Sequence, residues 1–146
     1  MRIVSPTLGP RGDVALLVLR VVVGAAFVSH GFPKMLHATT WASTMVPGTP
    51  FWLQAIAAFA EFGGGIALIL GILTPLFAFL IGCNMVVAIF FIALPHGATF
   101  VSNTGGQTFE LPLIYLAAVF TLLLLGPGRA SLDGALFRER STRRRR

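Results

Sequence analysis

Charged side chains are scarce in this sequence. Asp, Glu, Lys and Arg make up 11% of its 146 residues, whereas soluble domains carry about 25%. Hydrophobic residues make up 55% of the chain, and the mean hydropathy is +0.84. A chain with so little charge and so much apolar surface is not a water-soluble globular domain. The composition therefore predicts a membrane protein, and the length suits a single domain.

Cysteine is almost absent, with Cys83 as its single representative. One sulfur excludes an intramolecular disulfide, a CxxC redox pair and a thiolate-rich metal site. We expect Cys83 to pack as an apolar residue. Any redox chemistry would therefore depend on a bound cofactor or on a partner protein.

The positive charge of the chain is confined to a few places. The net charge is +6, and six of the eleven basic residues lie between Arg138 and the end of the chain. Cations gathered in a short tail are typical of a topology signal or of contact with anionic membrane lipids. A nucleic-acid surface would spread its cations over one face of a folded domain. We expect membrane lipids as partners and no nucleic acid.

Four apolar stretches, each close to the ~20 residues that cross a bilayer as a helix, are separated by segments rich in Pro, Gly and polar residues. They predict an all-α membrane protein, an antiparallel bundle of four transmembrane helices. The expected division has a cytoplasmic N-terminal lead, a membrane domain and a basic cytoplasmic tail. The lead covers residues 1–13, the membrane domain 14–126, the tail 127–146, and the spans are about 14–32, 51–70, 76–94 and 109–125.

The distribution of basic residues predicts the orientation. They flank the start of the first span and the end of the fourth, while the two long loops contain only Lys34. Cytoplasmic loops carry the excess of Lys and Arg, so both termini are expected in the cytoplasm, with the spans in the bacterial inner membrane. A cleaved signal peptide is the alternative for the first span. Arg20 interrupts its apolar run and no clear small-residue cleavage site follows, which favours an uncleaved span.

Polar residues inside the spans are the first candidates for function. An Arg in an apolar span costs about 3 kcal/mol or more unless it finds a partner. Arg20 lies in the first span, Glu61 in the second and Asn84 in the third, all near mid-depth. We expect Arg20 to pair with Glu61, and Asn84 to complete the network. The alternative is an ion pair that only fixes the register of the helices.

A second group of polar residues lies at the extracytoplasmic ends of the predicted spans: His30, Lys34, His96 and Glu110. The up-down-up-down topology brings these ends together, so we expect the four side chains to converge. Simple solvation at the membrane interface is the alternative. Two His and one Glu can bind a metal, but no local H-x-x-H spacing is present and Lys34 would repel a cation. We therefore predict no metal.

Small residues mark a surface for helix packing in the second span. Ala60 and Gly64 are four positions apart, and Gly63 and Gly65 flank the latter. Small residues at this spacing allow a neighbouring helix to approach closely. We expect Ala60, Gly63, Gly64, Gly65 and the mid-span Asn84 to serve helix packing.

An ordered set of short motifs runs through most of the chain and resembles the DoxX family of small bacterial integral membrane proteins. The resemblance implies a four-helix membrane protein. It also implies a link to quinone-dependent sulfur oxidation or to membrane oxidoreductase complexes that handle oxidative stress. The motifs are Leu19-Arg20, Ser29-His-Gly-Phe-Pro-Lys34, Glu61-Phe-Gly-Gly-Gly65, Leu70-Gly-Ile-Leu-Thr-Pro75, Leu94-Pro-His-Gly97, Gly105-Gly106, Glu110-Leu-Pro-Leu113, Gly126-Pro-Gly-Arg129 and Ser131-Leu-Asp133.

The leading hypothesis is an integral membrane subunit of an oxidoreductase system that binds a quinone or a similar lipid-soluble partner. It would act with other membrane or redox proteins, because no electron carrier can be built from the chain alone. Assembly into a homo-oligomer is a further alternative. No catalytic residue is assigned. The candidates for ligand binding or proton relay are Arg20, His30, Lys34, Glu61, His96 and Glu110.

Two other functions fit the same residues. In a small-solute transporter or permease, the polar side chains would line a path; transporters usually consist of repeated halves, and the chain has no convincing internal repeat. In a non-catalytic scaffold, the glycine-rich second span would bind partner membrane proteins.

Overall fold

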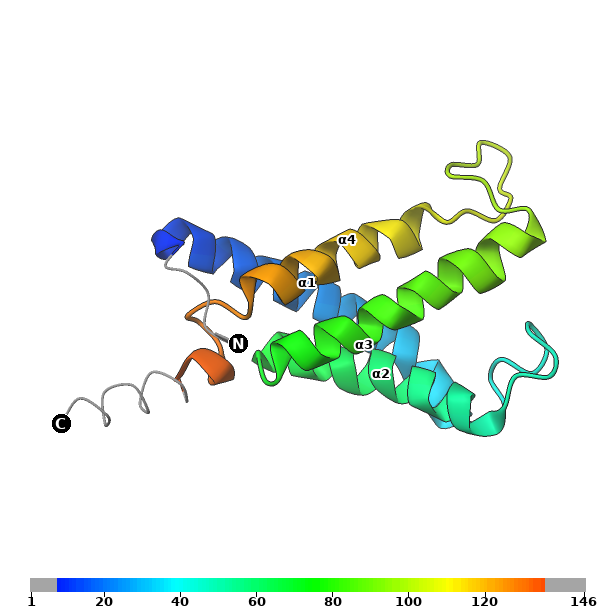
Figure 1. Cartoon of the computed structure of the whole chain (residues 1–146), viewed down its shortest axis with the longest axis horizontal. Coiled ribbons are helices and arrows are strands. Elements are labelled where there is room, and N and C mark those ends of the chain that lie inside the picture. The colour runs from blue at the N-terminus through cyan, green and yellow to red at the C-terminus, as the bar shows by residue number, and fades with distance from the viewer. Residues whose placement is uncertain (1–7, 136–146) are drawn as a thin grey trace.

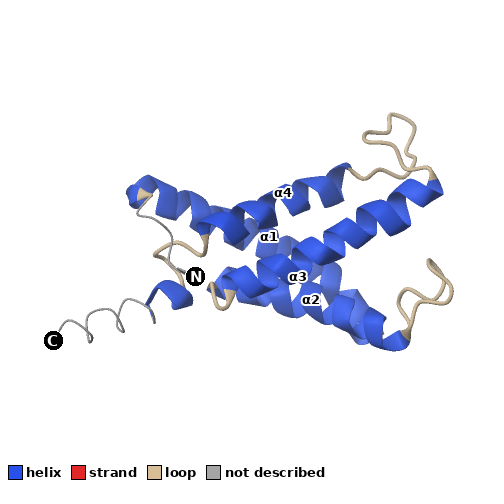
Figure 2. Ribbon diagram, in the orientation of Figure 1, coloured by secondary structure: helices blue, strands red, loops and turns tan. Residues whose placement is uncertain are grey.

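The computed structural model describes residues 8–135, and these residues form a bundle of helices joined by loops (Figures 1 and 2). The prediction of an all-α membrane bundle is confirmed. Within this part of the chain the only β interaction is an isolated bridge between Thr99 and Thr108. The helices are α1 (Gly9–Leu36), α2 (Phe51–Leu70), α3 (Thr74–Val87) and α4 (Glu110–Leu125).

Helix α1 is longer at both ends than the first predicted span. It begins at Gly9, so residues 9–13 of the predicted N-terminal lead are part of the helix. Pro10 favours this start, because the first N–H groups of a helix have no intrahelical partner and proline lacks an N–H. At the other end Pro33 lies inside the helix, which continues to Leu36. Residues 1–7 of the predicted lead lie outside the described residues.

Helix α3 follows α2 after a very short turn and continues beyond its α-helical part. Gly71 ends α2 in the left-handed conformation, with φ of +68°, which glycine adopts without steric cost. A π-helical segment (Ala88–Ala93) and a single 3-10 turn (Leu94–His96) extend α3. Together they give a 23-residue apolar span, Thr74–His96.

Packing within the bundle is uneven. Helix α1 packs mainly against α2, and α4 mainly against α3, whereas α1 and α4 touch only sparsely. The start of α1, the α2–α3 turn and the chain that follows α4 gather at one end of the molecule (Figure 1). The two long loops, 37–50 and 97–109, lie at the opposite end. We call these the turn end and the loop end.

Glycines allow α1 and α2 to come close together. A Cβ added at Gly24 would lie 2.7 Å from the Gly65 carbonyl oxygen, and one at Gly31 would collide with the backbone nitrogen of Phe62. Gly64, the residue before Gly65 in α2, packs against the side chains of Phe77 and Ile81 on α3. Glycine-mediated packing in α2 therefore involves two neighbouring helices.

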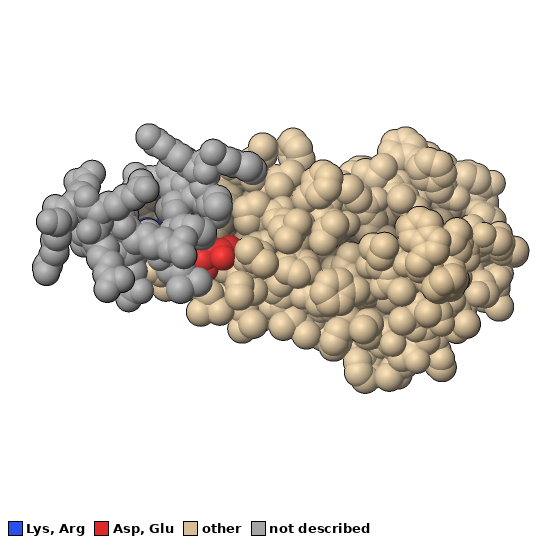
Figure 3. Space-filling model, turned by 60° about the horizontal axis from the view of Figure 1, so that its bottom comes forward, with Lys and Arg blue, Asp and Glu red and all other residues tan. Residues whose placement is uncertain are grey.

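The outside of the bundle is apolar along most of its length. Large hydrophobic side chains such as Val22, Phe59, Phe91 and Leu124 are exposed. On the face drawn in Figure 3, charged side chains gather at one end of the described residues. Three of the described helices are long and apolar enough to cross a membrane, and α4, with 16 residues, is shorter. A bilayer is the solvent that matches such a surface.

Candidate functional site

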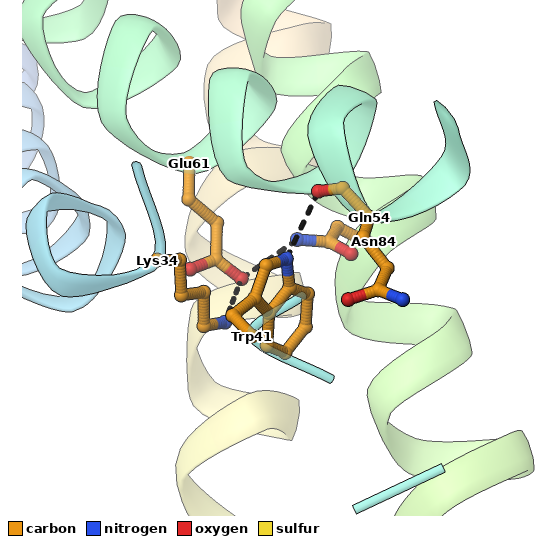
Figure 4. Close-up of polar contacts among 5 residues, drawn as sticks. All are labelled: Lys34, Trp41, Gln54, Glu61 and Asn84. Carbon is orange, nitrogen blue, oxygen red and sulfur yellow. Dashed lines mark hydrogen bonds and ion pairs between the residues drawn. The ribbon is translucent and has the colours of Figure 1, made fainter. Parts of the chain in front are cut away.

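A partly buried ion pair joins α1 to α2 in the loop-end half of the bundle. The Lys34 ammonium lies 2.6 Å from Oε1 of Glu61, and the side chains are 27% and 4% exposed. Asn84 on α3 donates its Nδ2 hydrogen to the same oxygen at 2.7 Å (Figure 4). Three helices thus contribute one side chain each, and the expected contact between Asn84 and Glu61 is present. Buried charges need such partners, because burying an unpaired charge is very unfavourable.

The expected pairing of Arg20 with Glu61 is wrong. Arg20 is fully buried and donates to the carbonyl oxygen of Ala130, after the end of α4. Helical side chains tilt toward the N-terminus of their own helix. Because α1 and α2 are antiparallel, the Arg20 side chain reaches toward the turn end and that of Glu61 toward the loop end. Arg20 and Glu61 lie at similar depths along their helices, but their side chains point in opposite directions and do not meet.

The chain after α4 folds back onto the turn end instead of leaving the bundle as a tail. The buried Asp133 carboxylate accepts hydrogen bonds from the backbone N–H groups of Leu73 and Thr74, each at 3.0 Å. Its own N–H donates to the Gly71 carbonyl oxygen at 2.9 Å. Asp133 therefore satisfies N–H groups at the start of α3 and is also the acidic neighbour of Arg20. Residues 127–135 belong to the packed structure; the arginines at 138–146 lie outside the described residues.

A cavity of about 370 Å³ lies between α2, α3 and the α1–α2 loop. We call it the Asn84 cavity. Its polar groups are nearly all engaged in hydrogen bonds: the indole N–H of Trp41 donates to the Gln54 carbonyl oxygen, and the Thr49 hydroxyl donates to that of Val46. Asn84 uses one amide hydrogen for Glu61. The lining residues are Trp41, Ala42, Val46, Thr49, Leu53, Gln54, Ala57, Asn84, Val87, Phe91 and Ile92.

Gln54 holds the loop over this cavity. Its side-chain oxygen accepts the Ala42 N–H at 2.9 Å, and its amide nitrogen donates to the Thr49 carbonyl oxygen at 3.0 Å. The loop also contacts the ion pair, because the Lys34 ammonium lies 4.4 Å from the centre of the Trp41 ring, a cation–π distance. The roof of the cavity and the ion pair are thus one connected structure (Figure 4).

A second, smaller cavity of about 190 Å³ lies on the other side of the ion pair, where α1 and α4 are loosely packed. We call it the α1–α4 cleft. The Tyr115 ring packs 4.9 Å from the Phe27 ring and 6.2 Å from the His30 ring, between centroids. The cleft is the more polar of the two cavities. Its lining residues are Phe27, His30, Lys34, Glu61, Met85, Ala88, Leu111, Pro112 and Tyr115.

The predicted cluster at the loop end assembles only in part. His30 and Lys34 both line the α1–α4 cleft. His96 is exposed beyond α3, where its Nδ1 lies 2.6 Å from the Ile92 carbonyl oxygen, and Glu110 lies in the first turn of α4 without lining either cavity. The helical segment that extends α3 continues as far as His96. This extension places His96 beyond the α1–α4 cleft, away from His30 and Lys34.

Three residues of the site were not predicted from the sequence to belong to it: Trp41, Gln54 and Tyr115. Gln54 is a polar residue in the first turn of an apolar span, and Tyr115 is the only tyrosine in the chain. An amide in an apolar span and a lone tyrosine are the signals that distinguish these two positions in the sequence. Nothing in the sequence placed them beside Lys34, because the loop and α4 reach the ion pair only through tertiary packing.

A bundle of apolar helices with polar side chains joined inside it defines a helical membrane protein. The chain belongs to the DoxX family, whose model matches residues 15–94. It is similar to the inner membrane protein YqjF of Escherichia coli, with 29% identity over 126 residues that cover 85% of this chain and 93% of the relative. It is 33% identical to an uncharacterized protein of Haemophilus influenzae over 128 residues, 85% of this chain and 92% of the relative. No solved structure matches the chain.

Proposed function

We propose that this protein is the membrane subunit of an oxidoreductase system and that it binds a quinone or a similar lipid-soluble ligand in the Asn84 cavity. One observation carries the proposal. An apolar cavity beneath the α1–α2 loop has one wall residue, Asn84, that is hydrogen-bonded to a partly buried ion pair. Sites for small apolar ligands combine hydrophobic walls with a few placed polar groups.

The cavity suits a quinone head group in both size and chemistry. Its volume of about 370 Å³ lies within the range of roughly 300–1,000 Å³ typical of small-molecule sites. The Asn84 amide has a second N–H hydrogen and a carbonyl oxygen. The N–H can donate to a quinone carbonyl, and the oxygen can accept from a quinol hydroxyl. Asn84 can therefore bind both redox forms of such a ligand.

Electrons would have to come from a partner protein. The sequence contains one cysteine, so it cannot supply a dithiol of its own. A bound quinone needs an electron donor or acceptor in contact with the membrane. The proposal therefore includes a redox protein that docks on this subunit.

We infer that the protein lies in the bacterial inner membrane with both termini in the cytoplasm. Its relative in Escherichia coli is named an inner membrane protein. Arg11 and Arg129 flank the first and last spans at the turn end, and the loop end has Lys34. The excess of basic residues favours a cytoplasmic turn end.

Binding of a short-chain ubiquinone to the protein in lipid nanodiscs tests the proposal. Quinones quench tryptophan fluorescence, and the variant Trp52→Phe leaves only Trp41, which lines the cavity. We expect saturable quenching in this background. Asn84→Leu should weaken binding by about tenfold, the equivalent of one hydrogen bond of about 1.4 kcal/mol.

Asn103→Leu is the matched control, since Asn103 lies in the exposed 97–109 loop away from the cavity, and it should bind like the parent. Quenching that does not saturate, or that Asn84→Leu leaves unchanged, would contradict the proposal. Uptake of a small solute by proteoliposomes without quinone binding would instead favour the transporter hypothesis.

A further inference from the structure

Glu61 stands between the two cavities, and its two carboxylate oxygens have different surroundings. Oε1 accepts from both Lys34 and Asn84. Oε2 is buried and has no hydrogen-bond partner among residues 8–135. It is turned away from Asn84 in Figure 4, and Glu61 lines the α1–α4 cleft but not the Asn84 cavity. A buried carboxylate oxygen without a partner is unfavourable. Among the buried unpartnered atoms of the described residues, which also include Arg20 Nε, Arg20 Nη1 and Thr74 Oγ1, it is the one whose side chain lines the α1–α4 cleft.

We propose that the α1–α4 cleft is a proton-exchange route to Glu61, separate from the cavity that holds the lipid-soluble ligand. This assignment rests on the proposed function for its ligand. It goes beyond that function by giving each cavity its own role: the ligand binds on the Asn84 side, and protons reach and leave Glu61 on the α1–α4 side.

The hydrogen-bond geometry accommodates both charge states of Glu61. When a proton arrives, an O–H bond forms at Oε2, and Oε1 continues to accept from Lys34 and Asn84. When the proton leaves, that bond breaks and the carboxylate again faces the Lys34 ammonium at 2.6 Å. Neither step requires the three-helix contact to open. Both charge states of Glu61 can therefore keep the hydrogen bonds from Lys34 and Asn84.

Every helix packed around Glu61 contributes a group that faces it or the cleft. Helix α1 provides Lys34 and His30, α4 provides Tyr115, and α3 provides the neutral Asn84. An imidazole has one ring nitrogen that can donate a proton and one that can accept it, and His30 lines the cleft, so we assign it the role of carrier at the rim. The cleft volume of about 190 Å³ is large enough to admit water.

Asn84 connects proton exchange to the ligand. Its Nδ2 hydrogen bond to Oε1 is 2.7 Å long, and hydrogen bonds to a charged acceptor are roughly twice as strong as those to a neutral one. Protonation of Glu61 therefore weakens this bond and changes the orientation preference of the Asn84 amide in the cavity. The hydrogen bond between Asn84 and Glu61 thus couples two properties: the charge of Glu61 and the affinity of the Asn84 cavity for a ligand that gains or loses protons.

Two alanines allow each cavity to be filled separately. Ala88 lines only the α1–α4 cleft and Ala57 lines only the Asn84 cavity. The variants Ala88→Phe and Ala57→Phe are made in the full chain and placed in nanodiscs. The first readout is the rate at which the Glu61 carboxylic acid exchanges hydrogen for deuterium. The exchange is monitored by the shift of its infrared band, which is identified as the band missing from the Glu61→Gln variant. The second readout is quenching of Trp41 by the short-chain ubiquinone.

We expect Ala88→Phe to slow exchange at Glu61 by roughly tenfold or more, as a barrier higher by about 1.4 kcal/mol would do, and to leave quinone binding intact. Ala57→Phe should abolish binding and leave exchange unchanged. Leu111→Trp fills the cleft from the exposed face of α4 and repeats the test if Ala88→Phe fails to fold.

The proposal is overturned if both cleft variants exchange at the parental rate, if Ala57→Phe slows exchange as much as they do, or if no Glu61 band titrates in the parent. Failure of the proposed function looks different. In that case the ubiquinone does not bind to the parent protein, while exchange at Glu61 still responds to filling of the cleft.

Discussion

The two charged residues near the middle of the first two spans, Arg20 and Glu61, are stabilised at opposite ends of the bundle. Glu61 pairs with Lys34 and Asn84 in the loop-end half, and Arg20 holds the chain after α4 at the turn end. Arg20 has a structural contact there, since a backbone carbonyl is its hydrogen-bond partner and Asp133 is its acidic neighbour. Glu61, which lines the α1–α4 cleft, is the better candidate for function.

We expect the contact between Arg20 and the returning chain to contribute measurably to stability. Arg20→Met keeps the apolar bulk but removes the hydrogen bond to Ala130, so we expect the free energy of unfolding to fall by about 1–3 kcal/mol. Asp133→Asn should also destabilise, because it removes the charge that attracts Arg20 and one carboxylate acceptor at the start of α3. Thermal and denaturant unfolding in detergent measure both effects.

The double variant identifies the coupling between these two residues. If they stabilise each other, Arg20→Met with Asp133→Asn loses less than the sum of the single losses, by about 0.5 kcal/mol or more. Strict additivity would show that Asp133 acts only through the backbone of α3.

At the level of helices, glycine determines how closely α1 approaches α2. Gly24 and Gly65 each occupy a position where a Cβ would lie 2.7 Å from a backbone atom of the other helix. Backbone atoms cannot move aside as a flexible side chain does. The close α1–α2 pair brings Lys34 near Glu61, so this packing is a condition for the site.

Gly24→Ala should therefore destabilise the protein, by about 1–3 kcal/mol, the usual cost of overpacking. Gly82→Ala in α3 is the matched control, because its Cβ would lie 3.7 Å from the nearest atom, an ordinary contact. Alanine there also removes the cost of glycine in a helix, roughly 0.5–1 kcal/mol, so the control is expected to be neutral or stabilising. Equal losses in the two variants would contradict close packing at Gly24.

The whole molecule is an open bundle whose loose side creates the cleft. Because α1 and α4 have few contacts, the α1–α4 cleft lies directly beside Glu61, whose side chain is only 4% exposed. The α1–α2 loop covers the opposite side and is held there by Gln54. The four apolar helices pack unequally. As a result, the α1–α4 cleft lies on the loosely packed side of the bundle and the Asn84 cavity lies on the side covered by the α1–α2 loop.

The membrane orientation of the whole chain is tested by cysteine labelling in a Cys83→Ala background. Thr44→Cys and Asn103→Cys place a thiol in each long loop, and Leu132→Cys places one at the turn end. A membrane-impermeant maleimide should label the two loop variants in spheroplasts and the third only after lysis. Labelling of Thr44→Cys and Leu132→Cys from the same side would overturn the arrangement of spans.

The sequence by itself determined the class of protein, the number of apolar helices and their approximate limits. Hydrophobic runs, turn residues and a scarcity of charge act locally, and the bilayer requires helices long enough to cross it. The same local information identified Lys34, Glu61 and Asn84 as polar residues in apolar surroundings. It also identified the glycines of α2.

Only the tertiary structure decided which of these residues meet. The direction of each side chain depends on the N-terminal tilt within its helix and on the antiparallel order of the helices, and this tilt separated Arg20 from Glu61. Asp133 and Gln54 acquired their roles because distant parts of the chain fold back onto the bundle. Such contacts depend on packing between residues far apart in sequence, which no local pattern encodes.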